Sequence, residues 1–189
     1  MAKQLSLIKA PKLIFGGSLL SGNARGKRIL CTKRPLHLVM RSSKAFGAKS
    51  FFNYKREINQ IIAKQAEAFG VRVYDLANSG NHLHFIVKIQ SAKLFANFLR
   101  AVSGLIARLV LKAEKANAKL KFGEAFWDAR PFTRIASWGR AYDSLKSYLR
   151  LNNLEAIGFI KHQPRGKGSL KKRQSFMVVR VEPIEIQMR

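Results

Sequence analysis

Cysteine is almost absent from this chain, whose 189 residues include only Cys31. A single cysteine excludes an intramolecular disulfide framework and any zinc site built from several cysteines. A free cysteine behaves more often as a small buried residue than as a reactive thiol. We therefore interpret Cys31 as a packing residue and look elsewhere in the sequence for chemistry.

Acidic residues are also scarce, with 10 Asp and Glu against 36 Lys and Arg, so the formal net charge is +26. Such an imbalance destabilises a compact chain by self-repulsion unless a polyanion offsets it. Nucleic acid is the first candidate for that partner, and an anionic membrane surface is the second. The basic residues are spread along the whole chain, and no uninterrupted apolar run approaches 20 residues. We therefore expect no membrane association.

The N-terminal region shows no signal-peptide pattern, because Lys9 and Lys12 interrupt its apolar residues. This predicts a cytoplasmic protein. Hydrophobic residues make up 47% of the chain, which is enough for a real core. The chain is therefore expected to fold as one compact domain with extensions, and not as a disordered basic tail.

Hydrophobic periodicity predicts a domain over 35–160, between a basic arm over 1–34 and a basic tail over 161–189. Ser50 and Ser91 stand where helix N-caps are expected. We expect strands at 36–40, 71–77 and 82–90, near Pro131 and at 176–182, and helices at 51–68, 91–117 and 141–157. The residues Asn78 to Asn81 predict a tight hairpin turn.

The order strand, helix, strand, strand, helix, strand, helix predicts an α+β fold of the split βαβ kind. In this ferredoxin-like or RRM-like arrangement, helices cover one face of an antiparallel sheet. The other face of the sheet is then free to carry chemistry.

The triplet His82-Leu83-His84 opens the apolar strand at 82–90. Alternate side chains of a strand point to opposite faces, so His82 and His84 share one face while Leu83 anchors the other in the core. Two imidazoles about 7 Å apart at Cβ, which is two strand rises, can converge on one divalent metal ion. Two histidines on a solvated or nucleic-acid-facing strand are the alternative interpretation.

Tyr148 and Asn152 lie four residues apart in the last predicted helix, so they share one helix face. A tyrosine beside two histidines and an amide oxygen could form a phosphoryl-transfer centre, in which the phenolate attacks phosphorus. Asn152 could supply a third metal ligand through its side-chain oxygen. A packing role for Tyr148 at a helix–sheet boundary is the alternative.

At this point the chain resembles the single-tyrosine HUH endonucleases, and among them the insertion-sequence-type and REP-associated tyrosine transposases. The segment Asn81-His82-Leu83-His84-Phe85-Ile86-Val87 resembles their metal-binding strand. Phe126-Trp127-Asp128-Ala129-Arg130-Pro131-Phe132 resembles the aromatic and basic strand before their catalytic helix. Tyr148-Leu149-Arg150-Leu151-Asn152-Asn153 resembles the end of that helix, although relatives often have Asn-Pro where this chain has Asn152-Asn153.

The resemblance, which covers about residues 35–160, implies a role for each matching residue. Tyr148 would be the nucleophile, and His82, His84 and Asn152 would hold Mg²⁺ or Mn²⁺. The implied reaction is cleavage and rejoining of single-stranded, hairpin-forming DNA through a 5′-phosphotyrosine intermediate. A homodimer is also implied as an option, in which the tyrosine helix serves the partner's histidines.

Basic and aromatic residues predict where DNA would bind. Arg130, Arg134 and Arg140 are expected to contact phosphates, and Trp127 and Trp138 could stack on bases or fill the core. Phe126 and Phe132 are expected in the core. The tail would either be solvated or clamp a DNA hairpin through Lys167, Lys171, Lys172 and Arg173.

Two other functions remain open at the level of sequence. The first is a regulator that binds nucleic acid on the same fold without catalysis, which would tolerate phenylalanine at Tyr148. The second is a basic protein associated with RNA, which would require the 2′-hydroxyl and show no metal effect.

Overall fold

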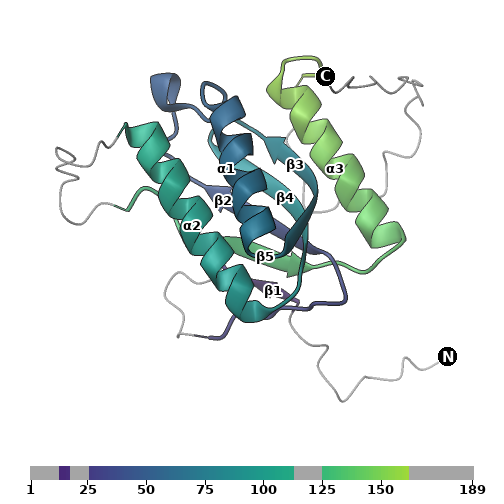
Figure 1. Cartoon of the computed structure of the whole chain (residues 1–189). Helices are drawn as coiled ribbons and strands as arrows, with labels where there is room; N and C mark the ends of the chain where they lie inside the picture. The colour runs from purple at the N-terminus through teal and green to yellow at the C-terminus, as the bar shows by residue number, and fades with distance from the viewer. Residues whose placement is uncertain (1–12, 18–25, 113–124, 162–189) are drawn as a thin grey trace, which may run out of the picture.

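A computed structural model describes residues 13–17, 26–112 and 125–161 (Figure 1). Its five strands form one sheet in the order β1-β5-β2-β4-β3, with every pair of neighbours antiparallel. The strands are β1 (Ile14–Phe15), β2 (Leu36–Arg41), β3 (Val71–Asn78), β4 (His82–Ile89) and β5 (Phe132–Ile135), and the α-helices are α1 (Lys55–Ala68), α2 (Ala92–Leu111) and α3 (Arg140–Ala156). The predicted strand at 176–182 and the basic residues of the tail lie outside the described residues.

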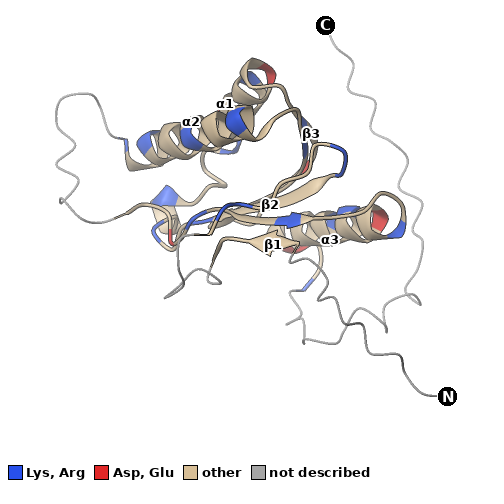
Figure 2. Cartoon of the chain, turned by 90° about the horizontal axis from the view of Figure 1, so that it is seen from below, with Lys and Arg blue, Asp and Glu red and all other residues tan. Residues whose placement is uncertain are grey.

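The predicted α+β, split βαβ fold with an antiparallel sheet is confirmed, with one difference in how its faces are covered. Helices α1 and α2 cover one face as expected, whereas α3 lies against the opposite face (Figure 2). Leu145 and Leu149 of α3 are buried with Ala77 and Ile86 of the sheet. The second face is therefore not fully free, because the apolar stripe of α3 needs a surface to cover.

Helix α1 begins at Lys55, four residues later than the sequence predicts. Phe51 is fully buried, and its backbone N–H and carbonyl both form hydrogen bonds to the hairpin turn. Its N–H donates to Gly80 O at 2.7 Å, and its carbonyl accepts from Asn78 Nδ2 at 2.9 Å. Ser50 donates its hydroxyl to Gly80 O at 3.2 Å. These contacts tie the segment before α1 to the turn that leads into β4.

The hairpin turn before the histidine strand is confirmed. Ser79 N–H donates to His82 O at 2.9 Å, and Gly80 N–H donates to Asn78 Oδ1 at 2.9 Å. Gly80 has φ +83°, and a Cβ at this position would lie 2.7 Å from the ring of Phe52. Only glycine fits this backbone without strain, so the turn fixes where β4 begins.

Helix α2 confirms its predicted cap, because Ser91 Oγ accepts from Leu94 N–H at 3.2 Å. By length and composition alone this helix could cross a membrane. In the fold, however, its apolar stripe, which includes Phe95, Phe98 and Val102, is buried against the sheet. The helix therefore has the character of a core helix.

Strand β1 lies within the segment that the sequence predicts to be an arm, and it extends the sheet beyond β5. Ile14 pairs with Arg134 and Phe15 with Thr133. Arg28 fixes this corner by donating to Pro131 O at 2.7 Å and to Thr133 Oγ1 at 3.0 Å. As a result, β5 is an inner strand that follows the bend at Pro131.

Candidate functional site

The histidines of β4 alternate with core residues as predicted. Leu83 and Phe85 are fully buried in the core on the side of α1 and α2. His82 and His84 point to the face that carries α3, with their ring centroids 4.7 Å apart. The strand therefore brings both imidazoles together on the predicted face.

A third histidine, His37 of β2, belongs to this cluster and has no assigned role in the sequence analysis. Its Nε2 lies 3.2 Å from Nδ1 of His84, and the two rings stack with centroids 5.4 Å apart. His37 is only 8% exposed. The one feature of the sequence that indicates which face His37 occupies is its position between Leu36 and Leu38. Both leucines are core residues, so His37 points to the opposite face of the sheet.

Each histidine of the triplet has its Nδ1 atom occupied by a neighbour. His82 Nδ1 lies 2.6 Å from the side-chain oxygen of Asn81, which can only accept, so this nitrogen carries the proton. His84 Nδ1 is occupied by His37. Metal-binding histidines commonly use one ring nitrogen for the metal and the other for such a partner. Both residues therefore keep Nε2 as the candidate ligand atom.

His37 and His82 are held in the uncharged form. Burial, and to a smaller extent the charge of Arg134, lower the pKa of His37 to about 4. Burial and the charge of Arg41 lower the pKa of His82 in the same direction. A neutral imidazole has a free lone pair for a ligand bond at neutral pH, so neither ring has to lose a proton before it binds a metal.

Tyr148 of α3 lies directly over this cluster. Its ring centroid is 5.5 Å from that of His84 and 6.0 Å from that of His37, and both contacts are nearly perpendicular. The side chain is half-buried, so it also faces solvent. Helix α3 thus brings the predicted nucleophile to the predicted metal ligands of the same chain.

Asn152 follows Tyr148 by one helical turn and is 7% exposed. The next residue, Asn153, fixes the end of α3 on β3: its Oδ1 accepts from Asn78 N–H and its Nδ2 donates to Leu76 O, each at 3.3 Å. This double contact accounts for the second asparagine where relatives often have proline. It also holds Asn152 close to the sheet.

The donor set fits a divalent ion bound by nitrogen and oxygen. Within the described residues, no three His, Cys, Asp or Glu side chains are placed to hold a metal. The candidate ligands are the imidazoles of His82 and His84 and the amide oxygen of Asn152. The amide oxygen is a ligand type that suits Mg²⁺ and Mn²⁺, whereas imidazole ligands suit transition metals. A single cysteine cannot supply the set of thiolates that selects softer metals.

Comparisons with known proteins agree with this geometry. The family model described as "Transposase IS200 like" matches residues 34–152, which is more than half of the chain. The chain belongs to the IS200-like transposase family. The predicted resemblance to single-tyrosine HUH transposases is thereby confirmed.

The fold of this transposase is also found in a solved structure. A REP-associated tyrosine transposase bound to a REP hairpin superimposes with a TM-score of 0.56 at 11% identity, covering 74% of this chain and 77% of the other. A Deinococcus radiodurans R1 protein named as a transposase gives a TM-score of 0.40 at 12% identity, covering 69% of this chain and 98% of the other. No curated protein matches the chain.

The predicted DNA-contacting arginines of the transposase occupy different places. Arg134 is exposed and lies opposite His37 in the sheet register, beside the histidine cluster. Arg140 is the exposed first residue of α3. Arg130 instead lies near Arg28, whose pKa falls to about 10 through burial and through the charge of Arg130. Arg41, which the sequence analysis did not single out, lies opposite His82 and pairs with Asp128 at 3.4 Å.

Trp127 is not placed to stack on DNA at this site. It packs against the core on the side of α1 and α2, 5.8 Å from the ring of Phe51. Its indole N–H donates to Ser103 O at 3.1 Å. The sequence could not distinguish packing from stacking here, because both favour an aromatic residue. Phe126 is buried as predicted, while Phe132 is half-buried with its ring edge-on to His37.

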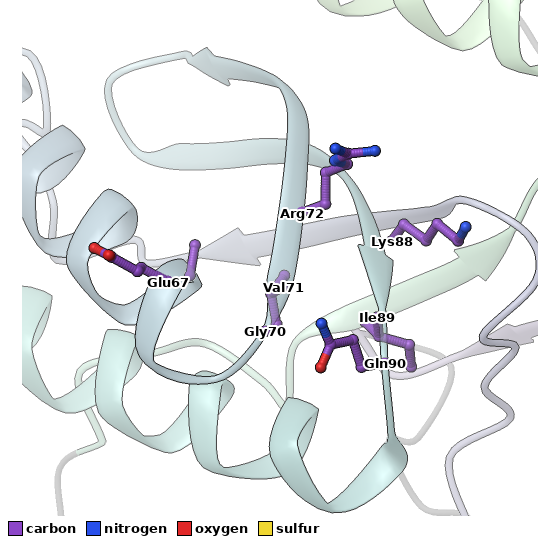
Figure 3. Close-up of a pocket in the computed structure, with 8 residues that line it drawn as sticks. Glu67, Gly70, Val71, Arg72, Lys88, Ile89 and Gln90 are labelled. Carbon is purple, nitrogen blue, oxygen red and sulfur yellow. The ribbon is translucent and has the colours of Figure 1, made fainter.

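An open pocket of about 400 Å³ lies at the far end of the β3–β4 hairpin. Figure 3 shows Arg72 and Lys88 extending from the neighbouring strands towards the same side. None of His82, His84 and Tyr148 lines this pocket. The candidate catalytic site of the transposase therefore lies outside this pocket, on the sheet face that carries α3.

Proposed function

We propose that this protein is a metal-dependent endonuclease and strand transferase for single-stranded, hairpin-forming DNA, with Tyr148 as its nucleophile. The observation that carries the proposal is the contact of the Tyr148 ring with His84, at 5.5 Å between centroids. A tyrosine, two imidazoles and a buried amide on one sheet face are the parts of a phosphoryl-transfer centre. Membership of the transposase family indicates that this chemistry serves DNA transposition.

In the first step, Tyr148 Oη attacks the phosphorus of a phosphodiester and loses its proton to solvent. An O–P bond forms to the 5′-phosphate, and the bond from phosphorus to the 3′ oxygen breaks. The released 3′ oxygen takes up a proton and becomes a hydroxyl. Attack by the 3′-hydroxyl of a different strand reverses these bonds and joins that strand to the 5′-phosphate.

His82, His84 and Asn152 would hold Mg²⁺ or Mn²⁺. When bound, such an ion polarises the scissile phosphate and stabilises its developing charge. Asn81 and His37 keep the two ligand imidazoles in fixed orientations. The cation of Arg134 lies beside the same cluster and would attract the DNA backbone.

The substrate is proposed from the charge of the chain and from its structural relative. A net charge of +26 favours a polyanion, and the REP-associated transposase of the same fold is described as bound to a REP hairpin. Arg130 and Arg140 would extend the phosphate contacts. Lys167, Lys171, Lys172 and Arg173 remain predicted clamp residues outside the described part. We place the reaction in the cytoplasm.

A single chain is proposed to contain one complete site. Helix α3 rests on the sheet of its own chain, with Tyr148 against its own His84. A homodimer could still form on DNA. The proposed boundaries of the catalytic domain, 35–160, enclose almost all of the family match at 34–152.

The test uses a labelled single-stranded DNA hairpin from the sequence that flanks the gene, incubated with Mn²⁺ and analysed on a denaturing gel. Wild type should form a covalent protein–DNA band, and both Tyr148→Phe and the double variant His82→Ala/His84→Ala should lose it. Tyr54→Phe is the matched control, because Tyr54 packs on the core side of the sheet. Hairpin binding without any adduct in wild type would refute catalysis and favour the regulator.

A further inference from the structure

Trp138 presents an exposed but fixed indole ring at the start of α3. The ring is 46% exposed, and its Nε1–H donates to Lys33 O at 2.9 Å. The rings of Trp138 and Tyr74 pack edge to face, with their centroids 5.6 Å apart and an interplanar angle of 89°. The ring centroid of Tyr142 lies 5.1 Å from that of Trp138, and the two ring planes are inclined at 54°. Three contacts from three parts of the chain therefore hold a large apolar surface open to solvent.

The three rings form one aromatic cluster on the same sheet face as the candidate catalytic site. Tyr74 and Tyr142 are themselves 5.9 Å apart, and both pack on the small core beneath α3, as Tyr148 does. The hydrogen bond and the two tyrosines restrict how the indole can turn. A fixed aromatic surface of this kind loses little conformational entropy when a flat ligand stacks on it.

Cations dominate the surroundings of the aromatic cluster. Arg72 and Lys88 lie directly opposite each other on β3 and β4, and Figure 3 shows them extending to the same side. Like charges in this position destabilise a sheet unless an anion offsets them. Lys146 Nζ lies 5.7 Å from the Tyr142 ring. Lys33, whose carbonyl accepts from Trp138, and its neighbour Arg34 are exposed cations, and the exposed Arg140 follows Trp138 by two residues.

Two carboxylates also reach this cluster. The pKa of Tyr142 is raised chiefly by burial, then by Tyr74, and then by the charges of Asp75 and Asp143. They are outnumbered by the six cations named above. The combination of an open aromatic ring with surrounding cations is the chemistry that binds single-stranded nucleic acid, with bases on the rings and phosphates on the cations.

The cluster lies within reach of the nucleophile. Tyr142, which contacts Trp138, precedes Tyr148 by six residues on α3. Six residues of α-helix rise about 9 Å. This is close to three base steps of about 3.4 Å along a strand. A strand with its scissile phosphate at Tyr148 could therefore place a nearby base over Trp138.

We propose that Trp138 is a stacking platform for an unpaired DNA base within a few nucleotides of the scissile phosphate. This inference rests on the proposed function, since it places the same strand on the same face. Tyr74 and Tyr142 act as positioning residues that hold the indole. Arg72 and Lys88 contact phosphates on the side of the cluster away from the histidines.

The chain allows a direct optical test, because it contains only two tryptophans. Trp127 packs, partly buried, against the core on the other face of the sheet, and Trp127→Phe leaves Trp138 as the only indole that fluoresces. Titration with a hairpin that carries its single-stranded flank should quench this fluorescence. A hairpin without the flank should quench it far less, and one abasic position within the flank should abolish the quenching.

Binding measurements in the otherwise unchanged protein provide a second readout that does not depend on Trp127→Phe folding. Trp138→Ala should weaken binding of the flanked hairpin about 5- to 150-fold, the equivalent of one stacked base. Trp138→Phe should restore most of that affinity, and neither variant should change binding of the hairpin stem alone. Melting temperatures of the variants would identify any that fail to fold.

The outcomes separate this inference from the proposed function. An oligonucleotide that forms the covalent adduct without quenching Trp138 would overturn the stacking role and leave the endonuclease intact. Quenching that an abasic flank abolishes, in a protein that forms no adduct, would support the stacking role and refute catalysis. Stronger quenching by an RNA of the same sequence would overturn the assignment to DNA.

Discussion

The Nε2 atom of His37 lies 3.2 Å from the Nδ1 atom of His84, in a part of the protein where both rings are buried. One proton occupies the space between two nitrogens that can each donate or accept. When His84 binds a metal through Nε2, its Nδ1 must carry that proton and His37 must accept it. His37 is thus suited to hold the ligand ring in one tautomer and one orientation.

Replacing His37 should weaken metal binding without touching any ligand atom. His37→Leu removes the acceptor, and losing such a partner typically costs 10- to 100-fold in metal affinity. His37→Gln supplies a side-chain oxygen and should recover part of the loss. Titration of Mn²⁺ by electron paramagnetic resonance measures the free ion in both variants. Equal Mn²⁺ affinity in wild type and His37→Leu would show that His37 serves packing alone.

Stability should depend on pH because His37 is neutral in the fold. Its pKa falls from 6.5 to about 4, so between these values the unfolded chain binds a proton that the folded chain does not. The free energy of unfolding should therefore fall as pH drops below 6.5, by on the order of 3 kcal/mol on reaching pH 4. His82 contributes with the same sign.

Urea unfolding at pH 7, 6 and 5 measures this dependence. The slope of stability against pH should be smaller in His37→Leu than in wild type, with His82 accounting for part of what remains. Identical slopes in the two proteins would mean that His37 has the same pKa in the folded and the unfolded chain.

Two inactive variants should fail to rescue each other. Tyr148 lies against His84 of its own chain, so a mixture of Tyr148→Phe and His84→Ala holds no chain with both groups. The covalent adduct should stay absent over a range of protein concentrations. Wild type diluted into either variant serves as the control for inhibition. Recovery of the adduct would show that the helix and the histidines come from different chains.

Arg134 should contribute to DNA affinity through charge. Arg134→Gln should weaken binding of a single-stranded substrate and reduce the slope of log affinity against log salt by about 0.7 to 0.9. Arg56→Gln is a matched control, since Arg56 is exposed on α1 across the sheet. Equal slopes for Arg134→Gln and wild type would remove Arg134 from the DNA interface.

Local patterns in the sequence predict much of this structure. Three features depend on residues that are close together in the chain: the alternation around His84, the turn at Gly80 and the cap at Ser91. The strand, the turn and the helix start can therefore be predicted from the sequence alone. Tyr148 and Asn152 share a helix face for the same reason. Their meeting with the histidines follows only from the family resemblance.

Features that depend on distant residues could not be predicted in this way. His37 meets His84 because β2 and β4 are neighbours in one register, which no local pattern specifies. The late start of α1 depends on Phe51 bonding to a turn about 30 residues later. Trp127 and Trp138 are equally aromatic in sequence, and only the fold distinguishes the ring that packs against the core from the exposed one.

The amide of Asn153 also bears on how two copies of the chain could exchange parts. Its two hydrogen bonds to β3 must break before α3 can leave its own sheet. The same two bonds form again if α3 then docks on an identical sheet in a second copy. They therefore contribute nothing to the equilibrium between closed and exchanged forms, and they raise the barrier between the two. Asn153 sets the rate of exchange and leaves its extent unchanged.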